Sequence, residues 1–367
     1  MAVRDGKKAA PIGVRSTHKP CQKLSAPTSC HSLHHLQSAS HPCEPNASYT
    51  PFIASDLHTM RNHTFSHLWQ TDQTNCLRGI ATLFIVIGHI LIEWNAHRVV
   101  NITGAIGVAM FLFMSGYGMH ESYKVSGLKH FWRKRFLRII LPYWIFITVL
   151  APFKADFTLH DYLLDIAFIN SSYWFIAYLV RCYLLYWLIQ RFVPSRLLTL
   201  YFIGGILTLN LCQQLEAQQA FSFMAGVLAS CHIERLRHTE GRRLLWASGI
   251  CFLIAFAFLM LKEIPAVHAY KGSLIYHYIL VMIMLPICMP LLLVPSVFPI
   301  LVRSRLLYFC GICSFEIYLV HMALLPMIEE PDLLRAVAYL AATILLTWLF
   351  YKFNQQLKRW GGLLQSR

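Results

Sequence analysis

The sequence predicts an all-α, polytopic membrane protein with about ten transmembrane helices and both termini in the cytoplasm. Hydrophobic residues make up 56% of the chain and charged residues only 13%, a balance far more apolar than that of a soluble domain. Ten apolar stretches are long enough to cross a bilayer, and the connections between them are alternately rich and poor in cations. Together these observations exclude a soluble globular domain.

The ten stretches are runs of mainly apolar residues, each near the length that a helix needs to cross the hydrocarbon core. In chain order they are residues 76–95, 102–122, 135–153, 173–190, 195–212, 216–231, 243–261, 275–295, 305–327 and 333–352. The sixth is the weakest, because it is short and contains Ser and Gly. The connection from Ala151 to Ser172 holds three Asp and one His, so we expect an interfacial helix or a re-entrant loop there.

The cations lie on alternate connections, which sets the predicted orientation. They are Lys124, Lys129, Arg133, Lys134, Arg135 and Arg138, then Arg191 and Arg196, then Arg235, Arg237, Arg242 and Arg243, then Arg303 and Arg305, and finally Lys352, Lys358 and Arg359. The positive-inside rule places these connections and both termini in the cytoplasm. The net charge of +15 is thereby explained by topology. We expect a multi-pass protein of the cell (inner or plasma) membrane and no nucleic-acid partner.

The first seventy residues differ from the rest of the chain. Residues 1–70 are rich in His, Ser and Pro and show no period of 2 or 3.6, which predicts a disordered tail ahead of a membrane domain over residues 71–367. The alternative is an over-long gene model, with Met60 as the start. No apolar core of a secretory signal peptide is present.

The Cys and His residues do not predict a metal site. Candidate ligands in the tail are Cys30, His31, His34 and His35, but their spacing does not recur as it does in zinc modules. Eleven cysteines occur in the chain, and most of those beyond the tail fall in apolar stretches, where Cys packs as a small apolar residue. We interpret the C-x-x-C of Cys310 and Cys313 in the same way.

Arg78 and His89 mark the candidate site. They bracket ten apolar or small residues in the first stretch, and eleven helical steps bring both side chains to one face about 16 Å apart. Both groups are costly to keep in lipid, so a function is the default hypothesis. The predicted orientation places Arg78 at the cytoplasmic boundary and His89 near mid-depth.

Further ionisable residues extend this candidate site. Glu93, one turn beyond His89, either orients the imidazole or lies at the outer interface. We expect Glu316 near mid-depth, close to His89 or to the acceptor. His321 lies five residues later, about 140° around a regular helix, so the two should not be direct partners. We expect His321 to be a polar residue at the outer end, with a functional role as the alternative.

Arg135 and Arg138 are three residues apart and should share one helical face. Two guanidinium groups on one face form a fork suited to phosphate. Topology alone is the competing explanation, because basic residues are expected at the cytoplasmic end of a span.

Four motifs, in this order, resemble the integral-membrane acyltransferase 3 family. They are Leu77–Ala81 with Gly88 and His89, Gly107–Tyr117, Arg135–Arg138 with Leu141–Tyr143, and Ser314–His321. The resemblance covers about residues 72–353. It implies ten spans, a cytoplasmic acyl-CoA donor, often acetyl-CoA, and modification of polysaccharide or glycolipid sugars at the cell surface.

The resemblance also assigns roles to residues. It matches Arg78 and His89 to the family's Arg-x10-His pair, with His89 essential, and Arg135 with Arg138 to its Arg-x-x-Arg pair, which handles the acyl donor. We expect the phosphates of CoA to lie against these arginines while the pantetheine arm carries the thioester toward His89. His89 would then act as a general base. An acyl-His89 intermediate is the alternative.

We therefore expect an O-acetyltransferase with no permanently bound cofactor. Its partners would be acyl-CoA, a carbohydrate or lipid-linked glycan acceptor, and membrane lipid. Two other functional classes stay open as hypotheses. One is a transporter of a small acyl or sugar metabolite, and the other is a membrane scaffold or receptor without catalysis.

Overall fold

The computed structural model describes residues 65–94, 102–153, 158–169 and 173–362, which are helical and contain no β-strand. The first elements are α2 (Thr71–Glu93), α3 (Thr103–Ser126), α4 (Phe131–Arg135), the π-helical η3 (Phe136–Ile140), α5 (Leu141–Leu150), η4 (Ala151–Phe153), α6 (Leu159–Ile166), α7 (Trp174–Phe192), η5 (Pro194–Arg196) and α8 (Leu197–Leu211). They are followed by α9 (Gln214–Ala217), α10 (Ser222–Cys231), α11 (Ile233–His238), α12 (Gly241–Lys262), α13 (Pro265–His268), α14 (Leu274–Val297), η6 (Pro299–Arg303), α15 (Arg305–Ile312), α16 (Ser314–Leu324), η7 (Leu325–Ile328) and α17 (Leu333–Trp360). Almost all of the predicted tail lies outside these ranges.

Several of these helices can cross a membrane. Five in the described part of the chain are long and apolar enough: Thr71–Glu93, Phe131–Phe153, Gly241–Lys262, Leu274–Val297 and Leu333–Trp360. The pair formed by α15 and the segment Ser314–Ile328 makes a sixth if it counts as one span. The all-helical membrane class is thus confirmed. The count of ten spans and the cytoplasmic termini stay predictions.

Two predicted stretches are not single helices. The stretch 305–327 bends by 81° between α15 and α16, next to Gly311. A Cβ on Gly311 would lie 2.1 Å from the Asn75 carbonyl oxygen, so this close approach to α2 requires glycine. The stretch 216–231 divides into α9 and α10, because the side chain of Gln219 donates to the Ala105 carbonyl at 2.9 Å and anchors a turn between them.

The connection from α5 to α7 contains a short helix, α6. A helix was one of the two structures predicted there, and a re-entrant loop was the other. Thr158 caps α6 by accepting a hydrogen bond from the Asp161 backbone N–H at 3.0 Å. Leu159 and Leu163 are exposed, while Asp165 is buried. The location of α6 at the membrane interface stays a prediction.

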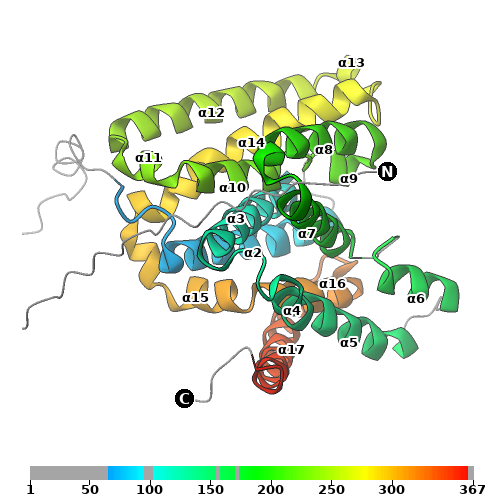
Figure 1. The fold of residues 1–367 in the computed structure, drawn as a ribbon. Coiled ribbons are helices and arrows are strands. Elements are labelled where there is room, and N and C mark those ends of the chain that lie inside the picture. Colours follow the sequence, from blue (N-terminus) through cyan, green and yellow to red (C-terminus); the bar gives the residue numbers. More distant parts are fainter. Residues whose placement is uncertain (1–64, 95–101, 154–157, 170–172, 363–367) are drawn as a thin grey trace, which may run out of the picture. The chain divides into compact units, whose positions relative to one another are not determined.

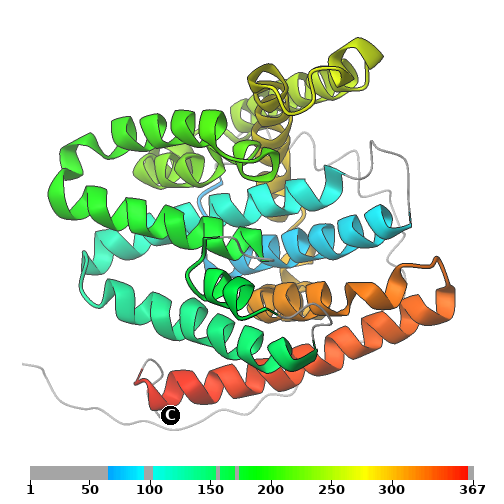
Figure 2. The ribbon, with the colours of Figure 1, turned by 90° about the vertical axis from the view of Figure 1, so that its right-hand side faces the viewer.

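Helices α2 and α3 lie side by side at the centre of the contact network (Figures 1 and 2). Helix α2 also contacts α14, α15 and α16, and α3 contacts α10 and α14. Glycines permit this proximity: a Cβ on Gly88 would lie 2.3 Å from the backbone nitrogen of Gly104. Because Gly88 precedes His89, the same close approach sets the position of His89 beside α3.

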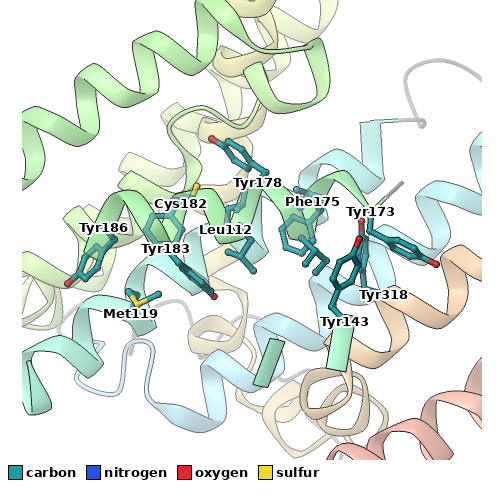
Figure 3. Close-up of a cluster of buried hydrophobic side chains, with 14 of the residues drawn as sticks. Leu112, Met119, Tyr143, Tyr173, Phe175, Tyr178, Cys182, Tyr183, Tyr186 and Tyr318 are labelled. Carbon is teal, nitrogen blue, oxygen red and sulfur yellow. The ribbon is translucent and has the colours of Figure 1, made fainter. Parts of the chain in front are cut away.

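Aromatic side chains join α3, α5, α7 and α16 in one core cluster (Figure 3). Tyr318 of α16 packs edge-on against Phe175 of α7, with ring centroids 5.2 Å apart. Tyr143 and Tyr186 are fully buried. Tyr173, Tyr178, Tyr183 and Tyr186 are spread along the length of α7, so this cluster extends from one end of the helix to the other.

The end of α17 packs against the segment that carries Arg135 and Arg138. Arg133 donates from Nη2 to the Gly361 carbonyl at 2.6 Å, and Gly361 lies against the side chain of Leu137. Figure 2 shows α17, in red, running alongside α16. This packing brings residues far apart in sequence to one end of α2.

Candidate active site

His89 of α2 and His321 of α16 form a hydrogen-bonded pair. His89 Nδ1 lies 2.9 Å from His321 Nε2, and the two rings are stacked with centroids 5.1 Å apart. His321 is fully buried, and its Nδ1 lies 2.7 Å from the Ile317 carbonyl oxygen. The sequence prediction that His321 is an outer-end polar residue missed this pairing.

The hydrogen bonds assign the tautomer of both rings. A carbonyl oxygen only accepts, so Nδ1 of His321 must carry a proton. In a neutral His321 the Nε2 atom is then an acceptor, and His89 donates to it from Nδ1. A neutral His89 therefore carries its free lone pair on Nε2. This is the state that a general base requires.

His89 lines a cavity of about 820 Å³ at one end of the bundle. The cavity lies between the C-terminal ends of α2 and α12 and the N-terminal ends of α3, α7 and α14. Because Nδ1 of His89 is engaged with buried His321, Nε2 is the nitrogen available to a ligand. The indole of Trp174 and the amides of Gln214 and Gln218 also line this space. We call it the histidine cavity.

The two predicted carboxylates have different positions. Glu93 lines the histidine cavity together with His89. Glu316 does not line it; it is 3% exposed and its Oε1 accepts a hydrogen bond from Asn354 Nδ2 of α17 at 2.9 Å. The structure therefore brings Glu93, but not Glu316, to the cavity. The hydrogen-bond partner of His89 is His321.

Arg78, Arg135 and Arg138 come together at the other end of α2. Arg78 and Arg135 each interact electrostatically with Arg138 and with Tyr183 of α7. Lys358 of α17 interacts with Arg138 and with Glu316 in the same way. We call Arg78, Arg135, Arg138 and Lys358 the basic cluster. Lys358 was predicted only as a topological cation.

The predicted fork of Arg135 and Arg138 is altered by local structure. Residues 136–140 form a π-helix, whose wider turn moves Arg138 away from the position it has on a regular helix. Arg138 is exposed. Arg135 is partly buried, with its guanidinium 4.2 Å from the ring centre of Phe131 and Nη2 2.6 Å from Met119 Sδ. The two cations therefore have different surroundings.

Arg78 also lines a second, polar cavity of about 550 Å³. Trp69, Gln70 and Arg237 are among its other lining residues. Arg237 is held in place by donating from Nε and Nη2 to the Leu68 carbonyl, at 3.2 and 3.1 Å. We call this the arginine cavity, and it lies at the opposite end of α2 from the histidine cavity.

The described residues contain no cluster of His, Cys, Asp and Glu that could hold a metal ion. The candidate ligands of the tail, Cys30 with His31, His34 and His35, lie outside those residues. Cys310 and Cys313 are buried, with free thiols. This is consistent with their interpretation as packing residues.

Comparison with known proteins identifies the family. A family model for an acyltransferase domain matches residues 72–352, most of the chain. The chain belongs to the acyltransferase 3 family. No curated protein and no solved structure matches it.

Family membership and the apolar helices together make this protein a membrane acyltransferase. The matched region of the acyltransferase 3 protein holds the histidine pair and three members of the basic cluster. Lys358 and Asn354 lie beyond it. Through the packing of α17, Lys358 joins the basic cluster and Asn354 bonds to Glu316, so only the tertiary structure identifies these contacts.

Proposed function

We propose that this acyltransferase moves an acyl group, acetyl in the first instance, from cytoplasmic acyl-CoA to a hydroxyl of a cell-surface polysaccharide or glycolipid sugar. The observation that carries the proposal is the His89–His321 pair on the wall of the histidine cavity. A neutral imidazole with a free nitrogen facing a ligand-sized space is the arrangement that general-base catalysis needs.

The reaction would proceed by direct transfer. The acceptor hydroxyl oxygen attacks the thioester carbonyl carbon while His89 Nε2 takes the hydroxyl proton. The carbon–sulfur bond breaks, and the CoA thiolate leaves and recovers that proton from His89. His321 is a positioning residue: it accepts from His89 Nδ1 and favours the reactive tautomer, and it stabilises the imidazolium that forms.

The basic cluster supports an acyl-CoA donor. Guanidinium groups bind phosphate through charge-assisted hydrogen bonds, and Arg78 is the member of the cluster that also lines the arginine cavity. Arg78 and His89 share one face of α2 about 16 Å apart, a distance that an extended pantetheine arm can cover. We assign Arg78, Arg135 and Arg138 to donor binding on this basis.

The histidine cavity supports a sugar acceptor. An indole ring offers a flat apolar face, and side-chain amides both donate and accept hydrogen bonds, which suits a ring bearing several hydroxyls. Trp174, Gln214 and Gln218 provide these groups beside His89. Glu93, on the same wall, is placed to accept a hydrogen bond from a sugar hydroxyl.

The test is to compare surface glycans from cells that carry the wild-type protein or His89→Ala by mass spectrometry. The proposal expects one acyl mass to disappear from one sugar in the variant. His277→Ala is the matched control, because His277 is also a buried helical histidine but does not line the cavity. Identical glycans in wild-type and His89→Ala cells, at equal protein levels, would overturn the proposal.

A second measurement separates the two chemical roles of His89. Direct transfer expects no acylated enzyme when the purified chain is mixed with radiolabelled acetyl-CoA alone and quenched rapidly. A labelled peptide containing His89 would replace the general-base role with an acyl-His89 intermediate.

A further inference from the structure

Cations line one side of the histidine cavity. Lys262, His268 and Lys271 all belong to the segment that runs from the end of α12 to the start of α14, and all three line the cavity. Among the lining residues in the described part of the chain, Glu93 of α2 is the one carboxylate. The basic residues of the wall therefore come from a different chain segment than the reacting histidine.

Topology does not account for these cations. The predicted orientation places the connection between α12 and α14 on the outer side of the membrane, where the positive-inside rule predicts few Lys and Arg. A cation that topology does not require, lining a cavity, is a candidate for ligand binding.

The three basic groups are not equivalent. Lys262 is 6% exposed, and its Nζ lies 2.7 Å from Glu263 Oε1, so its charge is already paired. Lys271 is exposed and has no carboxylate within ion-pair distance among the residues that the structure describes. The Nε2 atom of His268 is buried and has no hydrogen-bond partner among the described residues. Among these three residues Lys271 is thus the exposed cation without a carboxylate partner, and His268 holds a nitrogen whose hydrogen bond is not made.

Both groups favour an anion. A buried polar nitrogen without a partner costs free energy until a ligand satisfies it. A carboxylate or phosphate oxygen supplies an acceptor to Lys271 Nζ, and such charge-assisted bonds are among the stronger ones in proteins. The same group gives an acceptor to an Nε2–H of His268 once that ring turns toward the cavity. Glu93 follows His89 by one helical turn, so its negative charge disfavours an anion beside the reacting nitrogen.

We infer that the acceptor is an acidic glycan, whose carboxylate or phosphate binds Lys271 and His268 while a hydroxyl of the same molecule reaches His89. This inference rests on the proposed function and narrows its acceptor class. It also orients the acceptor, with the acid group toward α13 and the acyl-accepting hydroxyl toward α2.

The experiment uses the full chain in lipid nanodiscs with radiolabelled acetyl-CoA and three p-nitrophenyl acceptors: the glucoside, the glucuronide and the glucoside 6-phosphate. The inference expects kcat/KM at least tenfold higher for one or both acidic acceptors than for the neutral glucoside. The two acidic arms distinguish a carboxylate from a phosphate source.

Substitutions test whether Lys271 causes the preference for an acidic acceptor. Lys271→Gln is expected to raise KM for the acidic acceptor about tenfold, about 1.4 kcal/mol, and to remove its advantage over the glucoside. Lys271→Arg should keep the advantage. Lys129→Gln is the control, because Lys129 is an exposed loop lysine far from the cavity lining.

The outcomes separate this inference from the proposed function. Equal rates for the three acceptors, preference for the glucoside, or transfer to none of them while His89-dependent hydrolysis of acetyl-CoA persists would overturn the acidic acceptor alone. An acidic preference that survives in Lys271→Gln would also overturn it. If acetyl-CoA is cleaved equally by wild-type and His89→Ala protein, the proposed function fails and the inference fails with it.

Discussion

The two ends of α2 carry different ionisable groups in different surroundings. At the histidine cavity, two imidazoles are paired, and one of them is wholly withdrawn from solvent. At the basic cluster, four cations share a region, and Arg138 is exposed. Under the proposed function, the chemistry takes place at one end and donor binding at the other. A reacting proton needs one nitrogen in one tautomer, whereas a polyanionic donor can be held by several charges that partly replace one another.

The first prediction concerns the end that depends on a single atom. His89→Ala should lower kcat for acetyl transfer by roughly 10²- to 10⁴-fold, the usual contribution of a general base. The KM for acetyl-CoA should change little, because His89 lies about 16 Å from Arg78. Steady-state kinetics of the chain in nanodiscs measure both. A large rise in KM with an unchanged kcat would place His89 in donor binding instead.

The second prediction tests whether His321 acts through His89. His321→Ala removes the acceptor for His89 Nδ1 and should lower kcat by roughly 10- to 100-fold, as loss of a supporting hydrogen bond commonly does. His321→Gln keeps an oxygen acceptor and should recover part of that loss. A double variant with His89→Ala should be no slower than His89→Ala alone. Additive losses would show that the histidines act independently.

The third prediction concerns the end where charges are shared. Changing Arg135 and Arg138 together to Lys keeps both charges and the topology but removes planar, bidentate binding of phosphate. The KM for acetyl-CoA should rise about tenfold, about 1.4 kcal/mol, with kcat nearly constant. Kinetics at varied donor concentration provide the measurement. An unchanged donor KM would return both residues to a purely topological role.

The smallest effect is expected at Lys358. Its interaction with Glu316 already offsets part of its charge, so Lys358→Gln should raise the donor KM only about two- to threefold, well under 1 kcal/mol. Lys352→Gln on the same helix is the matched control, since Lys352 lies over the Trp348 ring outside the cluster. Equal effects of the two variants would remove Lys358 from the donor site.

The sequence predicted the residues at both ends of α2 but only part of their pairing. It placed Glu316 near His89 or near the acceptor; in the structure Glu316 bonds to Asn354, and His321 bonds to His89. One signal for His321 was present: both histidines lie in the second half of stretches that run in the same predicted direction. No signal in the sequence indicated the π-helix after Arg135.

By itself the sequence determined the family, the all-helical membrane class, and the shared face of Arg78 and His89. These follow from motif order, hydropathy and the period of one helix, which are properties of neighbouring residues. The tertiary structure decided the pairing of His89 with His321, which lies 232 residues away. It also placed Lys358 in the basic cluster and the basic residues of the α12–α14 connection in the histidine cavity. The physical reason is that helical periodicity orients a side chain only within its own helix. Which helices meet depends on close approaches such as Gly88 to Gly104 and on the bend between α15 and α16.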